Sequence, residues 1–140
     1  MDTKDYLSQL WHINKRIELK LDELSRLRSM TTKVTTTFSD MPRSATRNVH
    51  RLEDAISRLI DLEEEINNDI DRFVDLKNDI METIKSIEYP QHRLILEMRY
   101  IHQMSFDKIC NELFYSPTHV YRLHNEALYL FELNHRKRWE

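Results

Sequence analysis

The segment from Ser116 to Asn125 combines a helix start with side chains that can bind DNA bases. Ser116 followed by Pro117 is typical of an N-cap with proline at the first helical position. A helix that begins here and turns Val120 and Leu123 inward leaves these side chains facing outward: Thr118, His119, Tyr121, Arg122 and Asn125. Arginine can bind guanine and asparagine can bind adenine through paired hydrogen bonds, and a threonine methyl can contact that of thymine. The spacing predicts a DNA-reading helix, but ordinary surface residues of a three-helix packing unit would give the same pattern.

A second group of residues could hold the phosphate backbone of DNA. The C-terminal tail is basic, and a serine and a lysine fall at the expected start of a neighbouring helix. The candidate phosphate contacts are Ser105, Lys108, Arg136, Lys137 and Arg138. Contacts of this kind position a protein on DNA but carry no sequence information.

Residues that could support enzymatic or metal chemistry lack the spacing that such chemistry requires. The run Glu63-Glu64-Glu65 lies in an acidic stretch and indicates a solvated helix face. The seven histidines never stand four residues apart, so no helical zinc pair is formed. Cys110, the only cysteine, stands beside Ile109 and indicates a small buried side chain rather than a nucleophile. We therefore expect no enzyme, no metal and no cofactor.

The composition indicates that helices alone must position these side chains. The chain has 140 residues and no glycine, where an average composition would give about ten. Phosphate-binding loops and tight β-hairpins need glycine at positive φ, so both are excluded. Charged residues make up 32% and hydrophobic residues 40%, a mixture typical of long solvated helices with apolar stripes. We predict an all-α fold.

Charge is distributed unevenly along the chain. The formal net charge is −3, which argues against indiscriminate coating of nucleic acid. Nine acidic residues face two basic ones from Asp61 to Glu82, whereas from Pro90 onward there are seven basic and six acidic residues with five histidines. A phosphate-binding surface is therefore expected at the C-terminal end. No apolar run approaches the roughly 18 residues of a membrane span, and the polar N-terminus is unlike a signal peptide, so we expect a cytoplasmic protein without a membrane partner.

Two heptad patterns predict a helical hairpin or coiled coil over residues 1–88. From about Thr3 to Met30, apolar side chains recur at alternating steps of three and four, with Asn14 in one slot: Leu7, Leu10, Ile17, Leu21 and Leu24. The pattern resumes strongly from about Asn48 to Glu88, with ten of twelve a and d positions apolar. Between them, residues 31–47 have no helical period. Their threonines, Pro42 and Ser39-Asp40 predict an irregular connection.

The second helix presents a stripe too wide for a single partner, which favours a four-helix bundle formed by a homodimer. The residues expected at the oligomer interface are Ile56, Leu59, Glu63, Ile66, Ile70, Phe73, Lys77 and Ile80. Two of the a positions are charged. Antiparallel pairing of two copies near Ile70 would bring Glu63 close to Lys77 of the other chain, whereas in a simple hairpin both would reach solvent from the edge.

Three shorter helices are expected in a C-terminal domain, residues 89–140. Tyr89-Pro90 ends the long helix, because a residue before proline is disfavoured in the α conformation. The first short helix then runs from Pro90 to about Tyr100, and Ser105 is a good N-cap for the second. With the helix that follows Ser116, this layout matches a helix-turn-helix.

The residues from Tyr89 to Phe131 resemble region four of bacterial sigma factors and its phage relatives. The similarity lies in three runs: Leu94 to Tyr100, Ser105 to Ile109, and Val120 to Leu128. The front of the chain resembles a phage family of unassigned function through Arg16 to Leu24, Ser39 to Pro42, and Asp61 to Ile66. Late transcription regulators of phages, of the ArpU/RinA kind, share the C-terminal module. The resemblance implies a regulator that binds double-stranded promoter DNA or host RNA polymerase.

One position departs from that resemblance. The turn of such helix-turn-helix modules usually carries glycine after the leucine that ends the first helix, and here Phe114 follows Leu113. A bulky residue at positive φ costs about 1 kcal/mol or more. Either the turn takes another shape, or Phe114 adopts a strained conformation that places its ring.

Two functions from different classes are therefore expected. The first is a phage or prophage transcription regulator whose helix-turn-helix binds a promoter and whose hairpin dimerises or contacts polymerase. The alternative is a protein-binding adaptor that docks on polymerase, or on another protein, without touching DNA.

Overall fold

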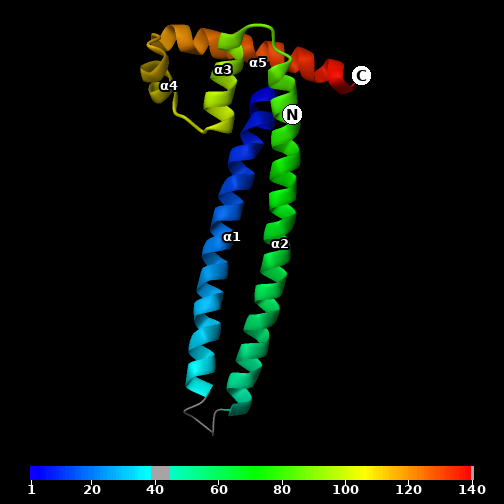
Figure 1. The fold of residues 1–140 in the computed structure, drawn as a ribbon, viewed down its shortest axis with the longest axis vertical. Coiled ribbons are helices and arrows are strands. Elements are labelled where there is room, and N and C mark those ends of the chain that lie inside the picture. The colour runs from blue at the N-terminus through cyan, green and yellow to red at the C-terminus, as the bar shows by residue number, and fades with distance from the viewer. Residues whose placement is uncertain (39–44, 140) are drawn as a thin grey trace. The chain divides into compact units, whose positions relative to one another are not determined.

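A computed structural model describes residues 1–38 and 45–139, whose regular structure is entirely helical. Two long helices come first: α1 spans Thr3–Phe38 and α2 spans Ala45–Lys85. The shorter elements are α3 (Pro90–Leu96), the π-helical turn η2 (Glu97–Ile101), α4 (Phe106–Leu113) and α5 (Pro117–Trp139), coloured from green to red in Figure 1. The all-α prediction is confirmed for these residues. None of their helices combines the length and hydropathy of a membrane span.

The chain divides into two compact units. We call Asn14–Arg72 the hairpin unit, and Met1–Ile13 together with Phe73–Glu140 the C-terminal unit. Residue 88, the domain boundary expected from the sequence, lies within the C-terminal unit.

In the hairpin unit, α1 and α2 run antiparallel. Leu24, Leu62 and Ile66 form its buried cluster, and Leu27 and Leu59 pack against them. The Lys20 Nζ lies 2.7 Å from an Asp69 carboxylate oxygen, and further along α1 the Arg28 guanidinium lies 3.1 Å from Glu63. Later residues of α1 thus meet earlier residues of α2.

On α2, the hairpin seam keeps the predicted d positions but uses g positions in place of the predicted a positions. Within the hairpin unit, α2 buries d and g positions, such as Leu62, Ile66 and Asp69. The a positions Ile56 and Ile70 stay 42% and 41% exposed. The apolar stripe is wider than one neighbouring helix can cover, so α1 packs on one edge of it and leaves the other edge open.

The prediction of an irregular connection over residues 31–47 is wrong at both ends of that range. Helix α1 continues to Phe38 and α2 already begins at Ala45, while Ser39-Asp40 and Pro42 lie outside the described residues. The Thr31 hydroxyl donates to the Leu27 carbonyl, and Thr32 donates to Arg28 in the same way. These bonds from residue i to i−4 satisfy the threonine hydroxyls inside the helix, so the threonines do not end α1.

In the C-terminal unit, two buried clusters join the helices. The larger contains Leu7 and Leu10 from α1, Ile80 and Ile84 from α2, and Phe131 from α5, among others. The smaller contains Met98, Ile109 and Val120 and joins α4 to the start of α5. These two clusters hold the first turns and the middle of α5.

The predicted helix starts of the C-terminal unit are confirmed. The Ser105 Oγ accepts a hydrogen bond from the Lys108 amide, and the Ser116 Oγ accepts one from the His119 amide, both at 3.2 Å. Helix α3 begins at Pro90. Helix α2 ends at Lys85, four residues before Tyr89, and its last carbonyls bind the amides of Ser86 and Ile87.

The Lys20–Asp69 pair provides a test of the hairpin seam. The Asp69 side chain is 5% exposed, so Lys20→Met would leave a buried carboxylate with only the exposed Arg72, 4.0 Å away, as its partner. We expect the variant to lose about 2–3 kcal/mol of unfolding free energy in urea titration.

Replacing both partners, Lys20→Met with Asp69→Leu, should recover most of that loss. The control is Glu23→Gln, which removes the exposed Arg58–Glu23 pair and should leave the unfolding free energy nearly unchanged. Equal losses in Lys20→Met and Glu23→Gln would contradict the buried pairing.

Candidate nucleic-acid interface

The first three turns of α5 present the expected base-reading side chains on one face. Val120 is fully buried and Leu123 is 5% exposed, which fixes the inward side of the helix. The opposite side carries the side chains predicted from the sequence, of which only His119 is half-buried: Thr118, His119, Tyr121, Arg122 and Asn125. The structure therefore brings all five together beside the capped helix start.

Arg122 is held by neighbours on its own helix. Its Nη2 lies 2.9 Å from the His119 Nδ1, and its Nε lies 3.9 Å from a Glu126 oxygen. The other Glu126 oxygen lies 2.9 Å from the Nε2 of His92, a buried residue of α3. Glu126 therefore orients the guanidinium, and it also competes for the charge that a phosphate or a base would bind.

Aromatic rings support this face from below. The Tyr121 ring packs against Phe106 of α4 with 4.8 Å between centroids. The Arg99 guanidinium lies over the Phe106 ring, 4.4 Å from its centroid. Tyr121 is nevertheless 50% exposed, so part of its surface remains accessible to a ligand.

The turn between α4 and α5 consists of Phe114, Tyr115 and Ser116. Phe114 adopts the left-handed conformation, with φ 58° and ψ 36°, and its amide binds the Cys110 carbonyl. The ring is 93% exposed. Of the two alternatives raised by the missing glycine, the structure has the strained one, and the aromatic ring projects into solvent.

The candidate phosphate contacts of α4 lie at its start. Ser105 and Lys108 are both exposed. The Ser105 hydroxyl oxygen already accepts the Lys108 amide, but its O–H remains able to donate to a phosphate.

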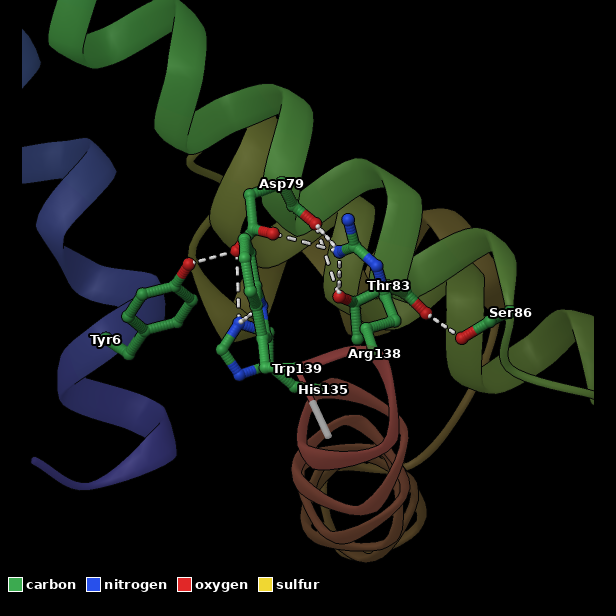
Figure 2. A network of polar contacts seen from close by, with 7 residues as sticks. All are labelled: Tyr6, Asp79, Thr83, Ser86, His135, Arg138 and Trp139. Carbon is green, nitrogen blue, oxygen red and sulfur yellow. Dashed lines mark hydrogen bonds and ion pairs between the residues drawn. The ribbon is translucent and has the colours of Figure 1, made fainter.

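The basic tail is partly committed to an internal network, drawn in Figure 2. The Arg138 Nη1 donates to the Asp79 carbonyl at 2.8 Å, to an Asp79 carboxylate oxygen at 3.0 Å and to the Thr83 hydroxyl at 2.7 Å. The His135 Nε2 lies 3.0 Å from Asp79, and Tyr6 donates its hydroxyl to the same carboxylate. Arg136 pairs separately with Glu132 at 2.7 Å. Arg136 and Arg138, two of the five expected phosphate contacts, therefore already have acidic partners within the chain.

This network holds the Asp79 carboxylate in its charged form. Burial alone would raise the pKa of Asp79, but the hydrogen bonds from Tyr6 and His135, together with the charges of His135 and Arg138, lower it below its usual value. Burial, with the Asp79 hydrogen bond and charge, raises the pKa of Tyr6 well above its usual value. The phenol therefore stays a proton donor.

The residues expected at an oligomer interface separate into two groups. Four of them pack within the chain: Leu59 and Ile66 in the hairpin unit, and Phe73 and Ile80 in the C-terminal unit. Ile56, Glu63 and Ile70 are exposed, and Lys77 is half-buried.

His124 is buried behind the proposed reading face. Its Nε2 lies 2.7 Å from the Tyr100 hydroxyl. Burial, aided by the nearby charges of Lys4 and Arg99, lowers the pKa of His124 to about 4, so the ring is neutral at pH 7. Among residues 1–38 and 45–139, no group of three or more His, Cys, Asp or Glu is arranged to hold a metal ion.

Two partners in these networks, Glu126 and Asp79, were not predicted from the sequence. The Phe114 ring, by contrast, was signalled by the missing turn glycine. Nothing in the sequence singled out Glu126 or Asp79 from the many other acidic residues of the chain, because their roles depend on contacts with residues distant in sequence.

A family model described as "Protein of unknown function (DUF1492)" matches residues 39–133. No curated protein and no solved structure matches the chain.

Replacing Phe114 tests the left-handed turn. Phe114→Gly should raise the unfolding free energy by about 0.5–1 kcal/mol, because glycine adopts positive φ without a Cβ clash. Phe114→Ala is the matched control, since it removes the ring but keeps the clash. Urea titration that finds the glycine variant no more stable than the alanine variant would contradict the left-handed conformation.

The His124 environment predicts acid sensitivity. Unfolded histidine binds a proton below about pH 6.5, whereas folded His124 resists protonation until about pH 4. The unfolded state therefore binds more protons in this window, and stability should fall by roughly 1–2 kcal/mol from pH 7 to pH 5. His124→Gln should flatten that profile in chemical denaturation, while His102→Gln, at an exposed position, should leave the slope unchanged. A slope that survives His124→Gln would count against this assignment.

Proposed function

The chain belongs to the DUF1492 family, whose function is unknown, and we propose that it is a transcription regulator of phage or prophage origin. In this proposal α4 and α5 act as a helix-turn-helix that binds double-stranded promoter DNA, and the protein works in the cytoplasm of a bacterial host. The origin and the promoter target rest on the resemblance of the C-terminal segment to sigma factor region four.

The observation that carries the proposal is the outer face of the first half of α5. A three-residue turn and a serine cap precede the helix, Val120 and Leu123 anchor its inner side, and Arg122 and Asn125 stand outside. A recognition helix requires this arrangement, because its first turns must enter the major groove while its inner side packs on the preceding helix. Ser105 and Lys108, at the start of α4, could hold the flanking phosphates.

The hairpin would supply a partner contact, either with a second copy or with RNA polymerase. If the protein dimerises, two α5 helices act together and the operator should be a two-fold repeat.

A protein-binding adaptor is the second candidate, and the Phe114 ring favours it. A phenylalanine that is 93% exposed and held in a strained conformation is typical of a protein contact, where aromatic anchors are enriched. A salt titration separates the two functions: binding through several phosphates weakens steeply with salt, and binding through an apolar contact does not.

Arg122→Ala tests the reading face. Because arginine discriminates bases by paired hydrogen bonds, we expect the variant to lose roughly 1–3 kcal/mol of binding at one base pair of the preferred site. Retardation assays would compare a duplex selected on the full chain with an unrelated duplex, at moderate salt.

Lys137→Ala is the control, as an exposed cation of the same helix away from the reading face. It should weaken binding to both duplexes equally and lower the salt dependence. The proposal fails if Arg122→Ala and the unmodified chain bind every duplex alike.

A further inference from the structure

Helix α2 carries an apolar stripe that its own chain leaves uncovered. Ile56, Ile60, Ile70 and Val74 are 42%, 59%, 41% and 46% exposed. They occupy the a and e heptad positions, which share one face of a helix. This face stands about a quarter of a turn from the d and g edge that packs on α1, the angle at which a helix in a four-helix bundle meets its second neighbour.

The residues of the same face, polar and apolar, are arranged symmetrically about Glu65. Going outward along a and e positions, Asn67 and Glu63 come first, then Ile70 and Ile60, then Val74 and Ile56, and finally Lys77 and Glu53. Each position on one side therefore has a counterpart of matching or opposite character on the other. A face with this order is complementary to itself when turned end over end.

We propose that this face of α2 binds a second copy of the chain, with the two α2 helices antiparallel and a two-fold axis near Glu65. Ile60 then packs on Ile70 of the second copy, and Ile56 packs on Val74. Glu53 meets the opposite charge of Lys77, and Glu63 meets the amide of Asn67. By symmetry each contact occurs twice, so two glutamate–asparagine pairs lie at the centre, two glutamate–lysine pairs close the ends, and the apolar contacts lie between them.

Other registers lose this complementarity. A shift of one heptad in either direction places an apolar residue opposite a polar one, such as Ile60 opposite Lys77 or Ile60 opposite Glu63. The register centred on Ile70, in which Glu63 meets Lys77, would require Ile56 to meet Ile84. Ile84 is fully buried within its own chain, so it offers no surface there.

Helix α1 extends the apolar surface beside this stripe. The Arg28 side chain reaches Glu63 of the stripe, and Leu21 stands one heptad before Arg28 on the same face of α1. Leu21 is 47% exposed. Leu21 therefore flanks the α2 stripe on the open side of the hairpin unit.

This inference rests on the partner role proposed for the hairpin, and not on DNA binding by α5. It is tested without DNA by sedimentation equilibrium of the full chain over a range of concentrations. The chain should dimerise, and Ile60→Lys and Ile70→Lys should each raise the dimer dissociation constant at least tenfold while circular dichroism stays unchanged. Leu19→Lys is the control, because Leu19 is 70% exposed but lies on another face of α1.

The register is tested by disulfide formation between two variants in a Cys110→Ala background. A mixture of Ile60→Cys and Ile70→Cys chains should form a disulfide-linked dimer under mild oxidation. Either variant alone should not, because its two cysteines would stand ten residues apart, about 15 Å along the helix axis. A monomer at every concentration would overturn the surface, and efficient linking of Ile60→Cys to itself would overturn the antiparallel register. Either result leaves DNA binding to be judged by its own assay.

Discussion

The C-terminal unit depends on the Asp79 carboxylate. This side chain of α2 accepts hydrogen bonds from Tyr6 of α1 and from His135 and Arg138 of α5 (Figure 2). A half-buried carboxylate is costly to desolvate unless several donors satisfy it, so three helix segments are tied to one point. The last turns of α5 are thereby committed to structure. Its first turns, anchored separately by Val120 and Leu123, are the part left to meet a ligand.

The absence of glycine has different consequences at the two left-handed residues found within residues 1–38 and 45–139. Gln103 adopts φ 57°, and its side-chain amide donates to the Tyr100 carbonyl at 2.6 Å, which offsets the strain locally. Phe114 adopts φ 58° with its ring 93% exposed. Strain at an exposed position that packing does not require is expected where a side chain serves binding. The adaptor function places Phe114 at the protein contact.

Local signals in the sequence predicted most of the secondary structure. The serine caps of α4 and α5 and the apolar period of α2 follow from side chains within a few residues of each other, so they could be read directly. The period could not show which edge of the wide α2 stripe would face α1, because that choice depends on the neighbouring helix. The threonines after Met30 were misleading, since their hydroxyls bond back to the helix carbonyls. The role of Arg138 was hidden for a further reason: its partners, Asp79 and Thr83, lie more than fifty residues away.

The division of α5 into an anchored end and a binding end can be measured by hydrogen exchange of the full chain, alone and with duplex DNA selected from a random-sequence pool. The account predicts that DNA slows exchange at the amides of residues 105–108 and 114–125. It leaves the amides of residues 134–139 unchanged, because Lys137 would contact phosphate only through its side chain. Slowed exchange confined to residues 134–139, with the first turns of α5 unaffected, would contradict it.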